Sequence, residues 1–192
     1  MGADDGRFYE FDEVKLEVQD FESDGFILDI GGGGEGVIGR LKGSRVVAID
    51  IRREELDEAP DGPLKIVMDA RDLKFTDGSF GAVTAFFALM YVGSQEDQQR
   101  ILQEAWRVLK GGGRLDLWDI DLAERPPTDK EAYIVRLRYR VRGAEFGTGY
   151  GQRWPREFRG EQYYRALAER AGFRHVSTER NRHVFHLVFR KD

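Results

Sequence analysis

The chain has 192 residues, of which 41% are hydrophobic and 34% are charged, and a formal net charge of −5 at pH 7. This length and balance predict a single soluble globular domain over residues 1–192, and the acidic charge argues against general nucleic-acid binding. The absence of cysteine excludes disulfides, thiolate nucleophiles and cysteine-held metal centres, and the three histidines lack a ligand spacing, so no metal site is predicted.

The first segment, residues 1–24, is strongly acidic, with nine acidic residues against two basic ones. It lacks the basic and apolar pattern of a signal peptide. No apolar run anywhere in the chain approaches the roughly 20 residues that span a bilayer. We therefore expect a cytoplasmic protein that does not bind membranes.

Five short apolar runs then alternate with helical stretches. The runs cover residues 26–30, 45–50, 65–69, 82–87 and 114–119. Unbroken apolar runs are typical of parallel strands covered on both faces, and strands separated by helices indicate right-handed βαβ crossovers. The pattern predicts an α/β fold with a doubly wound, mostly parallel sheet.

The clearest predicted helix follows the fourth run. Ser94, with Asp97 three residues later, makes a capping-box-like start. An apolar face at helical spacing covers residues 101–109, and Lys110 with three glycines marks the end of the helix.

The residue pattern in the last part of the chain predicts one helix and one hairpin. The helix covers residues 161–171 and stops at Gly172. Residues 175–180 and 184–190 are then typical of an antiparallel hairpin at the edge of the sheet. With these two strands the sheet is predicted to have seven.

Residues 125–160 break the alternation and predict a small insertion after the fifth strand. Within it, four arginines alternate with apolar residues over 135–142, which indicates a strand with one basic face. We interpret that face as solvated, with a rim that collects an anionic substrate as the alternative. The acidic residues 1–24 have the opposite sign and could meet this segment within one chain or across a homodimer.

A glycine-rich turn after the first strand is the first sign of a ligand site. Gly31, Gly32 and Gly33 stand where glycine accepts positive φ and lets a ligand approach the backbone. Asp50 ends the next strand, where a carboxylate accepts hydrogen bonds from ribose hydroxyls. These residues fit either a nicotinamide dinucleotide or S-adenosylmethionine.

Further features separate these two cofactors. Asp29 directly precedes the glycines, where a carboxylate repels a pyrophosphate but attracts the positive amino-acid end of S-adenosylmethionine. Asp69 and Ala70 close the third strand, in position to address an adenine edge. A glycine turn at residues 110–113 then joins a helix to the fifth strand. Together they favour S-adenosylmethionine.

In these segments the chain resembles the class I methyltransferases, in particular the small-molecule branch called type 11. The matching stretches are residues 27–33, 47–50, 68–75, 77–80 and 107–113, in the order and spacing of that family. The resemblance implies a Rossmann-like fold, S-adenosylmethionine as cofactor, S-adenosylhomocysteine as product and a small-molecule acceptor.

The resemblance also implies a role for each residue of the site. The methionine end of the cofactor is assigned to Asp29, Gly31, Gly32 and Gly33, the ribose to Asp50, the adenine to Ile51, Asp69 and Ala70, and the wall near the sulfonium to Phe86 and Phe87. Since the two phenylalanines alternate along a buried strand, at least one is expected to belong to the core.

Two positions depart from the family pattern. Glu35 stands where a third glycine is usual, with Gly36 one residue later, which could shift the turn or place a carboxylate near the cofactor's ammonium group. Gly81 stands where the family often has aspartate, at the far end of its strand from the cofactor. There we expect lost hydrogen bonding and some lost stability, not lost binding.

The acceptor side is less defined than the cofactor side. Tyr91, just past the fourth strand, and Tyr150, Arg153 and Trp154 of the insertion are the candidates to contact an acceptor. The alternative interpretation of the arginines of the insertion, as a rim around the site, implies an anionic acceptor. No catalytic residue is assigned, because methyl transfer chiefly needs proximity, alignment and a dry pocket.

Two alternatives to a methyltransferase stay open. A protein of the same fold could bind cofactor or a partner without turnover, given Glu35 and Gly81. A nicotinamide-dependent oxidoreductase accounts for the glycines and Asp50 but leaves Asp29, Asp69 and the turn at 110–113 unexplained.

Overall fold

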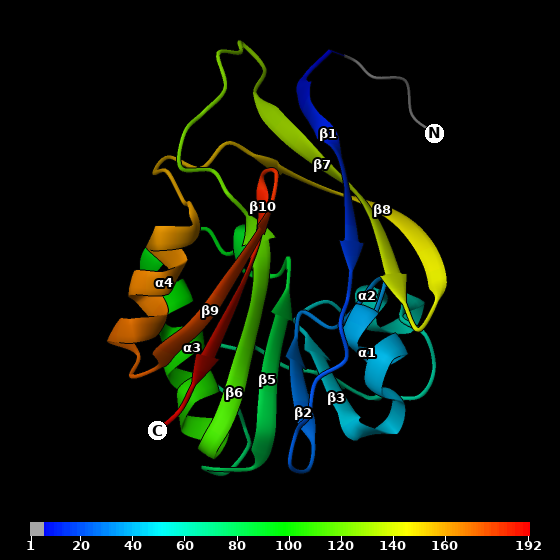
Figure 1. The fold of residues 1–192 in the computed structure, drawn as a ribbon, viewed down its shortest axis with the longest axis vertical. Helices are drawn as coiled ribbons and strands as arrows, with labels where there is room; N and C mark the ends of the chain where they lie inside the picture. The colour runs from blue at the N-terminus through cyan, green and yellow to red at the C-terminus, as the bar shows by residue number, and fades with distance from the viewer. Residues whose placement is uncertain (1–5) are drawn as a thin grey trace.

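The computed structural model describes residues 6–192, which form two sheets and four α-helices (Figure 1). The strands of the larger sheet are β2 (Ile27–Ile30), β3 (Val46–Asp50), β4 (Leu64–Val67), β5 (Phe80–Phe86), β6 (Leu109–Ile120), β9 (Arg174–Asn181) and β10 (Val184–Arg190). The smaller sheet contains β1 (Phe8–Glu17), β7 (Ala132–Val141) and β8 (Ala144–Arg153). The helices are α1 (Val37–Lys42), α2 (Arg53–Glu58), α3 (Gln95–Val108) and α4 (Glu161–Arg170), with short 3-10 turns η1 (Gly43–Arg45) and η2 (Leu89–Tyr91).

The larger sheet has the order β4-β3-β2-β5-β6-β10-β9. The five strands from β4 to β6 are parallel, and β10 lies antiparallel between β6 and β9. This confirms the predicted Rossmann-like α/β fold, with a mostly parallel seven-stranded sheet and a C-terminal antiparallel hairpin. The order changes direction between β2 and β5, and ligands of doubly wound sheets bind at the carboxyl end of such a point.

Burial follows strand position within the sheet. All residues of β2 and β5 are buried, because both strands lie in the middle of the sheet and are covered on both faces. The expectation that the third apolar run is covered in the same way is wrong. β4 is an edge strand, and the side chains of Leu64 and Val67 are 60% and 46% exposed.

The crossover from β4 to β5 also differs from the prediction, because residues 68–79 contain no helix. On the other crossovers the predicted helices form. α3 begins after Ser94, whose hydroxyl accepts a hydrogen bond from the Asp97 N–H at 3.0 Å, as the capping pattern predicts. α3 and α4 lie on one side of the large sheet and α1 on the other (Figure 1).

The predicted strand with a basic face forms as β7, but its partner was not predicted. β7 pairs in parallel with β1, which belongs to the acidic segment, and antiparallel with β8. Arg136 and Arg138 form ion pairs with Glu10 and Glu13 at 2.8 and 3.1 Å. The acidic and basic segments therefore meet within one chain; residues 1–5, with two of the nine acidic side chains, lie outside the described residues.

The other face of the small sheet is apolar and packs on the large sheet. Val135, Leu137 and Tyr139 of β7 are buried in one core cluster with Phe86 and Trp118 at the ends of β5 and β6. The small sheet thus covers this face beside α1, and it brings β8 close to the carboxyl ends of the parallel strands (Figure 1). None of the helices between residues 6 and 192 combines the length and apolar character that a membrane crossing requires.

Candidate functional site

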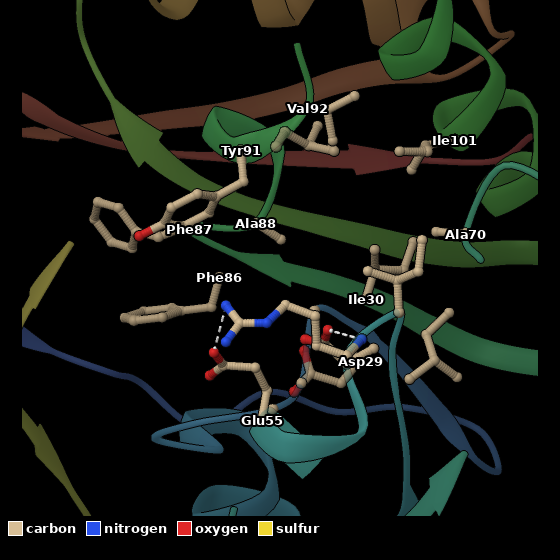
Figure 2. A pocket seen from close by; sticks show the side chains of 18 of the residues that line it. Asp29, Ile30, Glu55, Ala70, Phe86, Phe87, Ala88, Tyr91, Val92 and Ile101 are labelled. Atoms are coloured by element: carbon tan, nitrogen blue, oxygen red, sulfur yellow. Dashed lines mark hydrogen bonds and ion pairs between the residues drawn. The ribbon is translucent and has the colours of Figure 1, made fainter. Parts of the chain in front are cut away.

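A cavity of about 600 Å³ opens at the carboxyl ends of β2, β3 and β5 (Figure 2). All ten residues that the sequence assigns to the cofactor line it: Asp29, Gly31, Gly32, Gly33, Asp50, Ile51, Asp69, Ala70, Phe86 and Phe87. They come from four separate stretches of the chain, so only the fold brings them together. Glu55 of α2 also lines the cavity, but no motif in the sequence pointed to it.

The glycine turn is packed too closely for side chains. A Cβ at Gly31 would lie 2.7 Å from the Ala88 Cβ, and Gly31 has a φ of +69°. A Cβ at Gly33 would lie 2.5 Å from the Glu55 Cβ. Glycine here lets α2 and the chain after β5 approach the turn, and it leaves the backbone of the turn facing the cavity.

Asp29 is a buried carboxyl group at the floor of the cavity. Its side chain is 2% exposed, and the Thr84 hydroxyl donates a hydrogen bond to it at 2.7 Å. The pKa of Asp29 is raised to about 7, chiefly by burial. The Thr84 hydrogen bond acts to lower this pKa, and the nearby charge of Asp50 acts to raise it. A cation in the cavity would favour the ionised form of Asp29.

Asp50 ends β3 and Ile51 follows it, at the rim of the cavity. One carboxylate oxygen of Asp50 accepts a hydrogen bond from the Arg52 N–H at 2.9 Å, which fixes the side chain. Ile51 is 63% exposed although it is apolar, and it lines the cavity. An acceptor of hydrogen bonds beside an exposed apolar surface suits a sugar attached to a flat ring.

Asp69 is held by an ion pair with its neighbour. Arg71 donates to both carboxylate oxygens of Asp69, at 2.6 to 3.0 Å, and also reaches Asp97 at 3.2 Å. The Arg71 hydrogen bonds lower the pKa of Asp69. Asp69 therefore stays ionised as a fixed hydrogen-bond acceptor beside Ala70.

Phe86 and Phe87 both line the cavity and both belong to the core. Phe87 has a φ of +51°, a conformation that is rare for a bulky residue and is often found at functional sites. Its ring stacks on Tyr150, with ring centroids 5.0 Å apart and an interplanar angle of 13°. β8 thus contributes an aromatic wall to the cavity.

Glu35 connects the glycine turn to the same strand. The hydroxyls of Thr148 and Tyr150 both donate hydrogen bonds to its carboxylate, the second at 3.1 Å. Glu35 also lines the cavity. Its two hydrogen bonds therefore hold β8 in place beside the cavity.

A second cavity of about 530 Å³ lies next to the first, and Tyr91 and Gly93 line both. Of the four acceptor candidates, Tyr150 lines the first cavity, Arg153 and Trp154 line the second, and Tyr91 lies between them. The Trp154 indole also donates to the Lys130 carbonyl at 2.9 Å, so it holds the insertion together. Within residues 6–192, no three His, Asp or Glu side chains gather as a metal site would require.

Comparison with known proteins decides the family. Residues 28–117 match the family model described as a methyltransferase domain. The ubiquinone/menaquinone biosynthesis C-methyltransferase of Brucella canis is 32% identical over 168 residues, which are 84% of this chain and 57% of that protein. Residues 28–117 therefore belong to the methyltransferase domain family.

Two further methyltransferases are similar to this chain. The demethylmenaquinone methyltransferase of Listeria monocytogenes is 31% identical over 154 residues, 74% of this chain and 63% of that protein. The crystal structure of an S-adenosylmethionine-dependent methyltransferase of Methanosarcina mazei has the same fold, with a TM-score of 0.64 at 21% identity over 89% of this chain and 94% of that one. The chain spans about three fifths of the length of the curated relatives it matches.

Gly81 has a clear explanation in this class I fold. A Cβ there would lie 2.1 Å from the Asp24 carbonyl oxygen, because the segment before β2 passes directly over it. Glycine is therefore required with this backbone path, whereas the expected loss of stability relative to an aspartate stays a prediction. Gly81 does not line the cofactor cavity, as predicted from its place at the start of β5.

Proposed function

We propose that the chain is an S-adenosylmethionine-dependent methyltransferase that transfers a methyl group to a small-molecule acceptor, with S-adenosylhomocysteine as the product. The observation that carries the proposal is the gathering of the ten assigned residues around one cavity. The cavity has the size expected for a ligand of this kind. The predicted location is the cytoplasm.

The chemical character of the cavity supports this cofactor over a dinucleotide. Acidic side chains outnumber basic ones in its walls, with Asp29, Glu35, Asp50, Glu55, Asp69 and Asp97 against Arg52 and Arg71. Such a set repels a pyrophosphate and attracts the cationic amino-acid end and sulfonium of S-adenosylmethionine. An oxidoreductase is therefore the weaker alternative.

Each group of assigned residues would contact a different part of the cofactor. Asp29 and the glycine turn would hold the methionine end, Asp50 the ribose, and Ile51 with Asp69 and Ala70 the adenine. The cofactor supplies a methyl group on a positively charged sulfur, which receives the S–CH₃ bonding pair when the acceptor's lone pair forms the new bond.

The aromatic side chains then prepare the site for that transfer. Phe86, Phe87 and Tyr150 offer ring surfaces that exclude water and favour a cation. Burial raises the pKa of Tyr91 to about 12, so its hydroxyl keeps its proton and serves to donate a hydrogen bond instead of acting as a base.

Equilibrium titrations of the full chain with S-adenosylhomocysteine and with NAD⁺ test the proposal. We expect micromolar binding of S-adenosylhomocysteine and none of NAD⁺ at the same concentrations. The reverse preference would support an oxidoreductase. Tight binding without methyl transfer to any acceptor in a broad metabolite screen would support the non-catalytic alternative.

A further inference from the structure

The second cavity is the natural place for whatever meets the cofactor. It shares Tyr91 and Gly93 with the first cavity, so a molecule in it would lie beside the proposed methyl donor. Its walls are rich in rings, chiefly Tyr133, Trp154 and Tyr164. Flat aromatic walls favour a flat, apolar body over a chain of hydroxyl groups.

Arg159 is a buried cation in the wall of this cavity. Its side chain is only 8% exposed, and it donates to the carbonyls of Val92, at 2.7 Å, and Gly93. Its Nε–H group has no hydrogen-bond partner, and no carboxylate within residues 6–192 forms an ion pair with it. Buried guanidinium groups are normally paired, because an unpaired buried charge is costly.

Asp119, at the end of β6, does not supply the missing partner. It is fully buried, one carboxylate oxygen accepts from the Ile120 N–H at 2.8 Å, and the other oxygen has no partner. Burial raises the pKa of Asp119 to about 7, although the charge of Arg159 acts in the opposite direction. Of the two groups, Arg159 alone lines the second cavity, so its unpartnered Nε–H is the one that a ligand would complete.

The mouth of the cavity has the same sign of charge as Arg159. Arg153 and Arg156 line it and are exposed, and Glu157 is the one acidic side chain that lines it within the described part of the chain. The arginines of β7, in contrast, point to the opposite face of the small sheet and are paired with glutamates. Arg153 and Arg156 at the mouth of this cavity are therefore exposed to a ligand that enters it.

We propose that the second cavity binds the methyl acceptor, and that this acceptor is a small aromatic compound carrying a carboxylate that Arg159 recognises. The proposal rests on the proposed function, since it assigns the acceptor of the same reaction. The ring would lie among Tyr133, Trp154 and Tyr164. The atom that receives the methyl group would then point past Tyr91 toward the first cavity.

Benzoate and its uncharged analogue benzamide are suitable probes of the cavity. Saturation-transfer NMR titrations use the full chain already loaded with S-adenosylhomocysteine. We expect benzoate to bind about 10-fold more tightly than benzamide, because a charge-assisted hydrogen bond is stronger than a neutral one. Equal binding of the two probes, or displacement of S-adenosylhomocysteine by benzoate, would overturn the proposal.

Arginine substitutions test which side chain recognises the carboxylate of benzoate. Arg159→Gln is expected to reduce the advantage of benzoate to about 3-fold or less. Arg165→Gln, on the exposed face of α4 and outside the cavity, is the matched control and should keep the full advantage. Since Arg159 also holds two backbone carbonyls, the double variant Arg153→Gln, Arg156→Gln gives a second test on exposed residues, with an expected loss of benzoate affinity of about 3- to 10-fold.

The titration of S-adenosylhomocysteine separates two kinds of failure. If wild type does not bind S-adenosylhomocysteine, the proposed function itself fails. If it binds S-adenosylhomocysteine but the preference for benzoate survives in both the Arg159 variant and the double variant, only the acceptor assignment is wrong.

Discussion

Tyr150 donates a hydrogen bond to Glu35 at 3.1 Å, although the two residues lie 115 positions apart in the chain. The contact joins the small sheet to the glycine turn of the larger one. It also explains why a glutamate stands where the family usually has glycine. The carboxylate of Glu35 holds the strand that closes the cofactor cavity.

Removing this carboxylate should loosen β8. Glu35→Ala leaves the hydroxyls of Thr148 and Tyr150 without their acceptor, so we expect a loss of about 1–3 kcal/mol in the free energy of unfolding. Tyr150→Phe removes one of the two hydrogen bonds and keeps the stacking on Phe87, so its loss should be smaller.

Urea denaturation measures both losses, and amide hydrogen exchange measures the protection of β8. Glu54→Ala, at an exposed position of α2, is the control and should change neither. Unchanged exchange rates in β8 of Glu35→Ala would show that the contact does not hold the strand.

The limits of sequence reasoning are clearest at this small sheet. The alternating arginines of β7 predicted a strand, because that pattern is local. β1 escaped prediction because a register shift between Phe11 and Val14 interrupts its alternation and because its partner lies more than 120 residues away. The Glu35 contact was missed for the same reason, since it depends on where β8 is placed.

Gly81 offers a test of steric fit. A Cβ at this position would overlap the Asp24 carbonyl, so Gly81→Ala should destabilise the protein by about 1–3 kcal/mol. Binding of S-adenosylhomocysteine should not change, because the position is remote from the cavity. Gly111→Ala is the matched control, since nothing lies within 4 Å of its Cβ position. Thermal unfolding at equal or higher temperature for Gly81→Ala would contradict the account.

Asp29 should make stability depend on pH. Its pKa is about 7 in the folded protein and near 3.8 when unfolded, so the folded state binds the proton more tightly. Stability is therefore unaffected by this group below about pH 4, falls as the pH rises toward 7, and stays reduced above pH 7. Asp119 has the same sign and a similar value.

The substitution Asp29→Asn removes the contribution of one of these groups. We compare the free energy of unfolding of the variant with that of wild type at pH 5 and at pH 8. The difference between the two proteins should be about 1–4 kcal/mol more in favour of the variant at pH 8 than at pH 5. Urea denaturation at the two values measures the change. Asp61→Asn, at an exposed position, should show no such gain. An equal difference between variant and wild type at both pH values would mean that Asp29 titrates normally.

The cofactor cavity could be predicted from the sequence more fully than the acceptor cavity. Asp29, Asp50 and Asp69 each lie at or just beyond the carboxyl end of a parallel strand, so strand prediction alone places them at one edge of the sheet. Arg159 follows no motif, and its burial arises because its backbone pairs with Leu122 and its side chain reaches Val92. A residue buried by loop packing leaves no periodic signal in the sequence.

Calorimetric titration of S-adenosylhomocysteine against wild type, Asp50→Ala and Asp57→Ala tests the central claim most directly. The account predicts micromolar binding by wild type and by the exposed control Asp57→Ala. Asp50→Ala should bind about 10- to 100-fold more weakly, since it loses hydrogen bonds between the carboxylate and the ribose. Absence of binding by folded wild type, or equal binding by all three proteins, would contradict the assignment of this cavity to S-adenosylmethionine.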